Sequence, residues 1–397
     1  MRVARSLALA VTAVLAVACQ QKEAPKPAPA PAAPPPAAAA PADTVPFGII
    51  ACMTGEQATF GVSTENGIKL AVKEANDKGG VKGKKISLKT YDDQGKPEEA
   101  AIAAKRLVEQ DKVITMIGEI ASSRSLAIAP VADASKVPQI TPTSTNPRVT
   151  MDGDKVRPYV FRVCFIDPFQ GTVMAKFAIE NLKVKKAAIL RDVGNDYSVG
   201  LADFFKKKFE ELGGTIVSDQ SFKAGDQDFK AQLTAIKAKA PQFIFLPAYY
   251  GDVALAARQA RELGIKVPFG GGDGWDSSKL YEIAQGALDG SFFSNHYTDE
   301  SPDPKVQAFV KAYKDAYGSV PDALAALAYD AALVAIDSAN RAKELTGPGM
   351  RDAIEATKDF PGVAGVITLD AQHNPVKSAV VIGIEKNKPK YVATVNP

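Results

Sequence analysis

The chain has 397 residues, of which 46% are hydrophobic, so it is long enough and apolar enough for two domains with sizeable cores. Its 48 basic and 45 acidic side chains leave a formal net charge of +3 at pH 7. This balance excludes the strongly basic composition that is typical of nucleic-acid-binding proteins, and we expect no nucleic-acid partner.

The first 18 residues have the pattern of an export signal. Arg2 and Arg5 precede an apolar run at 7–18 that is too short to span a bilayer as a stable helix. Cys19 follows that run, in an arrangement that resembles the bacterial lipoprotein signal, although Ala16 stands where such signals prefer leucine. The resemblance implies that Cys19 is acylated and becomes the new N-terminus, and ordinary secretion is the alternative.

Residues 19–46 consist mainly of alanine and proline and hold almost no bulky apolar side chain, so they cannot form a core. Proline runs favour an extended conformation, which makes this segment a semi-rigid tether. We therefore predict an exported cell-envelope lipoprotein whose only membrane contact is the lipid on Cys19. Gln20 favours the outer membrane if the host is Gram-negative, but the sequence leaves inner versus outer anchoring open.

Strand and helix patterns alternate from Phe47 onward. The first run predicts strands at 47–52, 86–91, 113–117, 137–141 and 159–165. Between them we expect three helices, which end before Gly79, begin at Pro97 and begin at Ser122.

A second run of similar size starts at Asp167. It predicts strands at 186–190, 215–220, 243–246, 268–270 and 291–295, and helices at 170–182, 199–212, 229–238, 251–263 and 278–284. The tail adds helices at 305–317, 321–342 and 350–357 and strands at 366–369, 379–385 and 390–395. Two such runs predict an α/β fold of two doubly wound parallel sheets, and the tail completes both if the chain crosses back.

Two hydroxyl-rich loops follow neighbouring strands in the first run, Ser122-Ser123 and Thr143–Thr145. The carboxyl ends of parallel strands are where open α/β sheets bind ligands. Ser122 also stands where a helix begins, and the free N–H groups of a helix start suit an anion such as a carboxylate. The pattern predicts a carboxylate cradle without lysine or arginine, whereas capping and turn chemistry alone also explain these residues.

Cys52 and Cys164 lie in apolar, strand-like runs, and we predict buried free thiols, although two cysteines in an exported chain can also pair. Asp92-Asp93 ends a strand before a glycine, which favours turn and cap chemistry over a metal site. His296 and His373 are far apart, and the sequence has no P-loop, GxSxG, HExxH or CxxC motif. We expect no catalytic residue, no metal and no cofactor.

Several segments resemble a known family in the family's order: GEQATFG, VITMIGEIASS, ITPTSTNP, FRVCFIDPFQG, RDVGNDYSVG, AGDQDF, LPAYYGD and GGGDGWD. They are similar to the periplasmic leucine/isoleucine/valine-type (branched-chain amino-acid) binding proteins of ABC transporters, which have the type I periplasmic binding protein fold. The resemblance implies two lobes, 47–166 with 295–370 and 167–294 with 376–397. Three crossovers, near Ile166, Asn295 and 371–376, would form the hinge.

The resemblance also places the polar contacts of a bound amino acid. It implies that Ser122 holds the ligand carboxylate. Thr143 and Thr145 match a loop that contacts both carboxylate and ammonium. Asp273, in a glycine-rich loop of the second lobe, matches the acidic residue that pairs with the ammonium.

The same resemblance implies an aromatic lining for the cleft. Phe60 matches a position where a tyrosine often lines the side-chain pocket, and Tyr197 and Tyr249 match aromatic residues of the second lobe. Ser123 adjoins the carboxylate position. Trp275 adjoins Asp273, where it either walls the pocket or packs in the core.

We therefore expect a monomeric receptor, not an enzyme, that closes its lobes around a small amino acid, branched-chain or otherwise aliphatic, and delivers it to an ABC permease. The same fold binding an amide, or an aromatic or other carboxylate, is one alternative. A ligand sensor is another. The sequence leaves open which amino acid is bound and whether the role is transport or sensing.

Overall fold

The computed structural model describes residues 44–397. The predicted export signal, Cys19 and the tether up to residue 43 lie outside the described residues.

The first strand begins earlier than predicted, at Thr44 instead of Phe47. Thr44 pairs in parallel with Lys85, and Val45 is buried. The last residues of the predicted tether therefore belong to the first sheet, because Val45 adds an apolar contact to its core.

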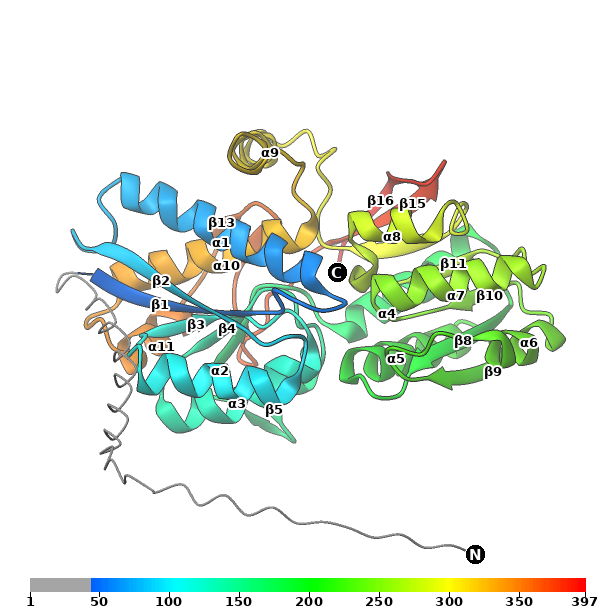
Figure 1. The fold of residues 1–397 in the computed structure, drawn as a ribbon, viewed down its shortest axis with the longest axis horizontal. Helices are drawn as coiled ribbons and strands as arrows, with labels where there is room; N and C mark the ends of the chain where they lie inside the picture. The colour runs from blue at the N-terminus through cyan, green and yellow to red at the C-terminus, as the bar shows by residue number, and fades with distance from the viewer. Residues whose placement is uncertain (1–43) are drawn as a thin grey trace, which may run out of the picture. The chain divides into compact units, whose positions relative to one another are not determined.

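The first sheet is entirely parallel, with the strand order β2–β1–β3–β4–β7. Its strands are β1 (Thr44–Ala51), β2 (Lys85–Asp92), β3 (Thr115–Ile117), β4 (Gln139–Thr141) and β7 (Val160–Arg162). β3, β4 and β7 are buried along their whole length, as expected where helices cover both faces. This sheet and the helices on it are called lobe one below (Figure 1).

Helices cover both faces of lobe one. They are α1 (Ala58–Asp77), α2 (Pro97–Glu109), α3 (Ser122–Ser135), α9 (Pro304–Tyr317), α10 (Ala323–Arg341) and α11 (Gly347–Glu355). One apolar core joins α1, α9, α10 and α11 to the sheet, and another lies under α2 and α3. Among the described residues, α10 alone has the length and composition of a membrane span, and it is buried in this core.

The second sheet has the order β16–β15–β12–β11–β10–β8–β9. Its strands are β8 (Lys186–Asp192), β9 (Thr215–Phe222), β10 (Phe243–Phe245), β11 (Phe269–Gly271), β12 (Phe292–Asn295), β15 (Ala379–Glu385) and β16 (Lys388–Val395). β15 runs antiparallel to β12, and β16 runs antiparallel to β15, so this sheet is mixed. It forms lobe two with its helices.

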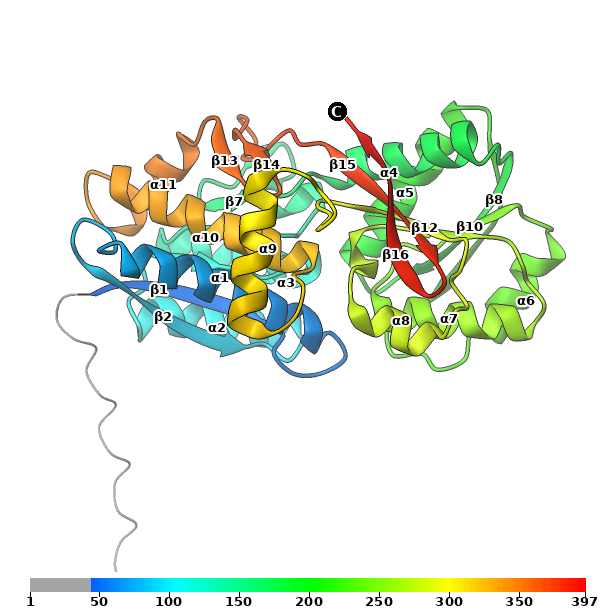
Figure 2. The same ribbon diagram turned by 90° about the horizontal axis from the view of Figure 1, so that it is seen from above.

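The helices of lobe two lie on opposite faces of its sheet, α4 and α5 on one and α6, α7 and α8 on the other (Figure 2). Their bounds are α4 (Asp167–Lys176), α5 (Asp196–Glu211), α6 (Lys230–Ala238), α7 (Tyr250–Glu262) and α8 (Ser278–Ala284). Aromatic rings from strands and helices fill the core between them, as in the stack of Phe205 on Phe245 at 3.9 Å.

The chain crosses back as predicted, but the tail strands differ. The predicted strand at 366–369 does not join the first sheet; it forms a hairpin from β13 (Phe360–Gly362) and β14 (Gly365–Ile367). A second small hairpin, β5 (Met151–Asp152) with β6 (Lys155–Val156), lies before β7. The first sheet is therefore completed by helices, and only the second gains tail strands.

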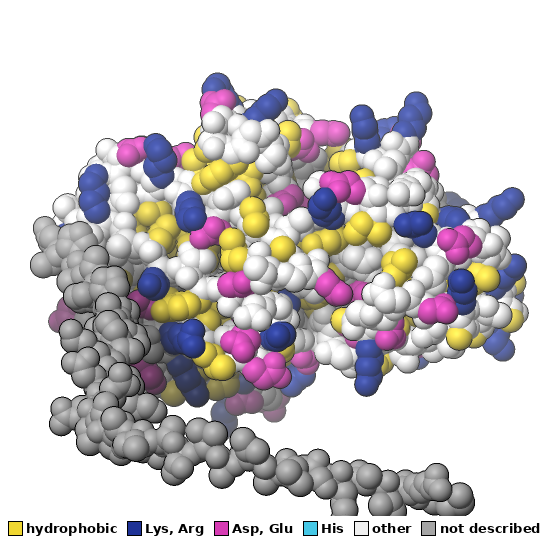
Figure 3. Space-filling view, viewed as in Figure 1, with side chains coloured by type: hydrophobic (Ala, Val, Ile, Leu, Met, Phe, Trp, Pro, Cys, Tyr) yellow, Lys and Arg dark blue, Asp and Glu magenta, His cyan; other side chains and the backbone are white. Residues whose placement is uncertain are grey.

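Cys52 and Cys164 are free and buried, so the prediction of buried thiols is confirmed. On the face of the molecule that Figure 3 shows, basic and acidic side chains are interspersed over both lobes.

Candidate functional site

A small cavity lies between the two lobes. Its walls come from lobe one, lobe two and the crossover after β12, and consist of Phe60, Ile120, Ala121, Ser122, Thr143, Tyr197, Tyr249, Asp273, Gly274, Asn295, His296, Ala323 and Leu324.

The lobe-one wall contains the N-terminus of α3. Ser122 is the first helical residue, and its hydroxyl oxygen accepts the Asn146 N–H at 3.2 Å. The Thr143 hydroxyl donates to the Ile120 carbonyl at 2.9 Å, which ties the two hydroxyl-rich loops together. Because a helix start presents unpaired N–H groups and a partial positive charge, this wall suits a carboxylate.

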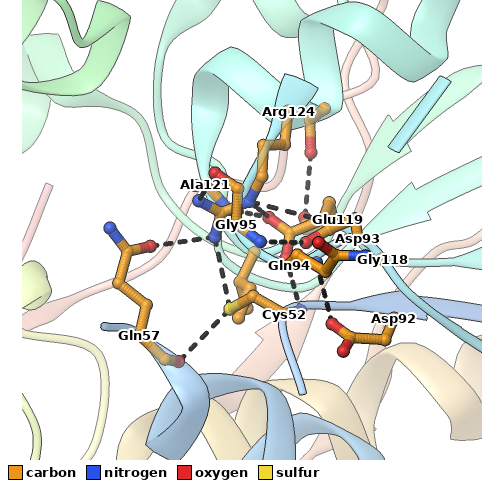
Figure 4. A network of polar contacts seen from close by, with 12 residues as sticks. Cys52, Gln57, Asp92, Asp93, Gln94, Gly95, Gly118, Glu119, Ala121 and Arg124 are labelled. Atoms are coloured by element: carbon orange, nitrogen blue, oxygen red, sulfur yellow. Dashed lines mark hydrogen bonds and ion pairs between the residues drawn. The ribbon is translucent and has the colours of Figure 1, made fainter. Parts of the chain in front are cut away.

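Glu119 holds the loop that leads into α3 (Figure 4). Its buried carboxylate accepts the N–H groups of Cys52 at 3.2 Å and Ala121 at 2.7 Å, and Nε of Arg124 at 2.7 Å. The side chain therefore fixes the loop to the end of β1 and to the first turn of α3. Sequence reasoning missed both Glu119 and Arg124, because nothing in the local pattern distinguishes them from ordinary surface charges.

The backbone carbonyl of Glu119 is a second point of attachment. It accepts the hydroxyls of Ser125 at 2.9 Å, Thr141 at 2.6 Å and Ser144 at 3.2 Å. From the other side, buried Arg162 donates to the Ser144 carbonyl at 2.7 Å. Both loops of the cradle are thus held by buried hydrogen bonds, which pre-organises them for a ligand.

Behind the cradle, one buried arginine lies beside two buried carboxyl groups that differ in protonation. Arg124 faces two buried carboxylates, with Nε 2.7 Å from Glu119 and 3.8 Å from Oδ2 of Asp93. Burial, together with the charge of Glu119, raises the pKa of Asp93 to about 8. With Asp93 protonated at neutral pH, the cluster holds one negative and one positive charge.

The adjacent Asp92 behaves differently, although burial opposes its ionisation. Its carboxylate accepts the hydroxyl of Thr54 and the N–H groups of Met53 and Gln94, and these hydrogen bonds lower its pKa. The predicted turn and cap chemistry is confirmed for this residue.

Asp273 forms the polar part of the lobe-two wall. It opens the short 3-10 helix η3 (Asp273–Trp275), and its N–H donates to Oε1 of Gln170 at 2.9 Å. Its Oδ2 lies 3.0 Å from Nε2 of His296. Its Oδ1 is buried and has no hydrogen-bond partner among residues 44–397. A buried carboxylate oxygen without a partner indicates that a donor from a ligand belongs there.

Aromatic rings form the apolar part of the cavity. Tyr197 and Tyr249 stack at a centroid distance of 5.3 Å, and the Tyr197 hydroxyl accepts the Gly274 N–H at 3.1 Å. Phe60 contacts Tyr249 edge-on at 5.9 Å. Ile120 and the start of α10 add aliphatic surface. This lining suits an apolar side chain.

Hydrogen bonds between the lobes close both rims of the cavity. On one rim, Asp196 of α5 is held by Ser123 at 3.0 Å, by Arg148 at 2.8 Å and, through its carbonyl, by Asn146 at 2.7 Å. On the other rim, the Tyr250 hydroxyl donates to the carbonyl of Glu56 at 2.5 Å. The structure is therefore a closed form of a two-lobe cleft.

Of the nine residues that the sequence placed at the ligand, six line this cavity: Ser122, Thr143, Asp273, Tyr197, Tyr249 and Phe60. Three do not. Ser123 points to the rim and bonds Asp196, and Thr145 is buried behind the wall with its carbonyl accepting the Asp167 N–H. Trp275 packs in the lobe-two core, where its Nε1 donates to the Leu246 carbonyl at 3.0 Å.

Asn295 and His296 line the cavity but were not predicted to do so. Their signal is a polar pair at the carboxyl end of the buried strand β12, whose last residue is Asn295, the same kind of position that identified the cradle. Ala323 and Leu324 carried no local signal, because only the return of the chain to lobe one brings α10 to the cavity.

Comparisons with known proteins agree with this geometry. The family model described as periplasmic binding protein matches residues 44–389. The Leu/Ile/Val-binding protein BraC3 of Rhizobium johnstonii is 32% identical, over 82% of this chain and 87% of the relative. The leucine binding protein LivK of Thermotoga maritima has a TM-score of 0.84 at 42% identity, covering 89% of this chain and 99% of its own. The substrate binding protein LivJ of Streptococcus pneumoniae, solved with isoleucine, has a TM-score of 0.84 at 33% identity, covering 89% and 100%.

Proposed function

The chain belongs to the periplasmic binding protein family, and from this premise we propose that it captures a small aliphatic amino acid and delivers it to an ABC permease. The names of its relatives support leucine, isoleucine and valine as the first candidates. In this proposal the protein performs no chemistry on its ligand; it binds, closes and releases.

One observation carries the proposal. The unpaired Oδ1 of Asp273 and the N-terminus of α3 line the same cavity from different lobes. An α-amino acid carries an ammonium and a carboxylate on one carbon, so it can satisfy both at once. Each group then makes a charge-assisted hydrogen bond in a site from which water is largely excluded.

The ammonium and the carboxylate of the ligand both contact the protein only when the cleft is shut. A ligand that contacts both lobes therefore stabilises the closed form over the open one. The side chain of the amino acid would lie against Phe60, Ile120 and Leu324, which offer no hydrogen-bond donor or acceptor from their side chains. This favours aliphatic over polar side chains.

Titration calorimetry with a ligand panel tests the proposal. We expect binding of L-leucine, L-isoleucine or L-valine, and much weaker binding of 4-methylpentanoate, which is leucine without its amine. Asp273→Asn keeps the shape of the site but removes the charge, and it should weaken amino-acid binding by at least about thirtyfold.

Thermal unfolding of the variant shows that it is folded. A benzoate or an amide that binds more tightly than every amino acid would contradict the proposal, as would an Asp273→Asn protein with unchanged affinity. A strain without the permease gives a further test. If that strain still responds to the amino acid through this protein, the protein acts as a sensor.

We also propose that the mature protein is a monomer anchored through a lipid on Cys19. The support is the lipoprotein-like signal followed by an alanine- and proline-rich tether. Labelling with a radioactive fatty acid should mark the wild type and not Cys19→Ser, which should move to the soluble fraction. Light scattering of the protein without its first 43 residues would measure the oligomeric state.

A further inference from the structure

His296 lies where the crossover after β12 passes the cavity, and nearly all of its surface is buried. Its ring stacks on Phe165 with a centroid distance of 3.6 Å. Nε2 lies 3.0 Å from Oδ2 of Asp273, and Nδ1 has no hydrogen-bond partner among residues 44–397. One side of the imidazole therefore meets Asp273, and its face is fixed by an aromatic ring.

Within the described part of the chain, His296 is the only side chain that hydrogen-bonds the carboxylate of Asp273. Gln170 holds the backbone N–H of Asp273 and leaves its carboxylate untouched. An ionised carboxylate only accepts hydrogen bonds, so Nε2 of His296 must carry the proton. This tautomer directs a neutral N–H at Oδ2 and leaves Oδ1 for another donor.

We propose that His296 is a positioning residue that orients the carboxylate of Asp273 and thereby sets the preference of the site for ligands with an amine. This inference rests on the proposed function. Without the imidazole, Oδ2 loses its donor, and the carboxylate is free to rotate. This change weakens the contact with an ammonium and leaves the carboxylate cradle of lobe one intact.

The arrangement also makes a pH-dependent contact. The charged groups that act on His296 are Asp273 and, with opposite sign, buried Lys377 of the third crossover. Burial lowers the pKa of His296 from its usual value, so the imidazole is neutral near pH 7. When acid protonates it, the imidazolium cancels the charge of Asp273, and affinity for an ammonium falls.

His373 provides a matched control. It is also buried and also stacks on a phenylalanine of the same strand region, Phe161, at 4.1 Å. Its Nδ1 lies 2.9 Å from the Val160 carbonyl, and the residue does not line the cavity. A change at His373 alters a buried histidine without altering Asp273.

The test measures L-leucine affinity by calorimetry from about pH 7 to about pH 5 for wild type, His296→Gln, His296→Leu and His373→Gln. Glutamine keeps an N–H donor for Asp273 but does not titrate, whereas leucine removes the donor. Other buried carboxyl groups titrate close to this pH range. The pKa of Asp93 and of Asp167 is raised to about 8, and that of Asp252 and of Asp322 to about 7. They are present in all four proteins, so the comparison cancels them.

We expect His296→Leu to bind leucine at least about tenfold more weakly at pH 7, and His296→Gln to stay within about threefold of wild type. Wild type and His373→Gln should weaken in parallel toward acid pH, and His296→Gln should weaken less. The inference is wrong if His296→Leu binds as tightly as wild type, or if His296→Gln keeps the full acid-side loss.

Thermal unfolding checks that each variant is folded. If His296→Leu does not fold, the pH profiles of His296→Gln and His373→Gln decide the question. If the wild type binds no amino acid at all, the proposed function fails and this inference with it. If the wild type binds and the histidine variants behave alike, only the inference fails.

Discussion

At the scale of single residues, Asp93 has an environment that favours its neutral form. Its Oδ1 accepts the Gly95 N–H at 2.8 Å, while Glu119 already neutralises Arg124. Because the pKa of Asp93 is raised from 3.8 to about 8, the folded protein retains a proton that the unfolded chain releases. The free energy of unfolding therefore falls as pH rises between these two values.

The expected effect can be isolated by substitution. From about pH 6 to about pH 8, Asp93 should lower the stability of the wild type by up to about 2 kcal/mol, and Asp93→Asn should remove this part of the slope. Urea unfolding at both pH values measures it. Asp92→Asn is the matched control: the pKa of Asp92 is lowered, so it is ionised at both pH values, and the variant should keep most of the Asp93 part of the slope. Equal slopes for all three proteins would contradict the assignment.

At the scale of elements, the junction between β3 and α3 requires glycine. Gly118 has φ of +120°, and a Cβ built there would lie 2.1 Å from the Ile50 carbonyl oxygen. Any other residue would combine a strained backbone with a clash against β1. The close approach of this turn to β1 is what brings the Glu119 carboxylate within reach of the Cys52 N–H.

We expect Gly118→Ala to destabilise the protein by about 3 kcal/mol or more, as measured by urea unfolding. Gly83 separates the effect of backbone strain from that of the clash. It also has a positive φ, +80°, but no atom lies within 4 Å of a Cβ built there. Gly83→Ala should therefore cost only about 1 kcal/mol. Similar losses for the two variants would show that the clash at Gly118 relaxes freely.

How far the sequence predicts the structure also depends on the element. The helix predicted at 278–284 and the strand predicted at 379–385 match α8 and β15, because periodicity and flanking signals are local. The cradle was found for the same reason, since strand ends are visible in the sequence. Trp275 was ambiguous because the direction of a side chain after a turn depends on the whole loop. Leu324 reaches the cavity only because the chain returns to lobe one, and no local pattern records that return.

At the scale of the whole molecule, affinity depends on closure as well as on contacts with the ligand. Asp196 joins lobe two to Ser123, Asn146 and Arg148 of lobe one, and it does not line the cavity. Its contacts exist only when the cleft is shut, so they add to the stability of the closed form alone. Ligand binding and this rim are thereby coupled through one equilibrium.

Asp196→Ala should weaken leucine binding by about fivefold without changing the ranking of ligands in the panel. Small-angle scattering should show a larger radius for the unliganded variant than for unliganded wild type. Asp203, on the same helix, contacts Arg191 within lobe two, so Asp203→Ala should leave affinity unchanged. A change in ligand ranking for Asp196→Ala would mean that it acts on the site itself.

The three crossings of the chain also have a consequence for biosynthesis. Lobe one needs α10 for its core, and lobe two needs β15 and β16 at the edge of its sheet, yet all three come near the end of the chain. As the polypeptide emerges with its N-terminus first, neither half is complete until this last segment has been made. Neither lobe can bury its whole core before then, which suits a chain that has to leave the compartment in which it is made.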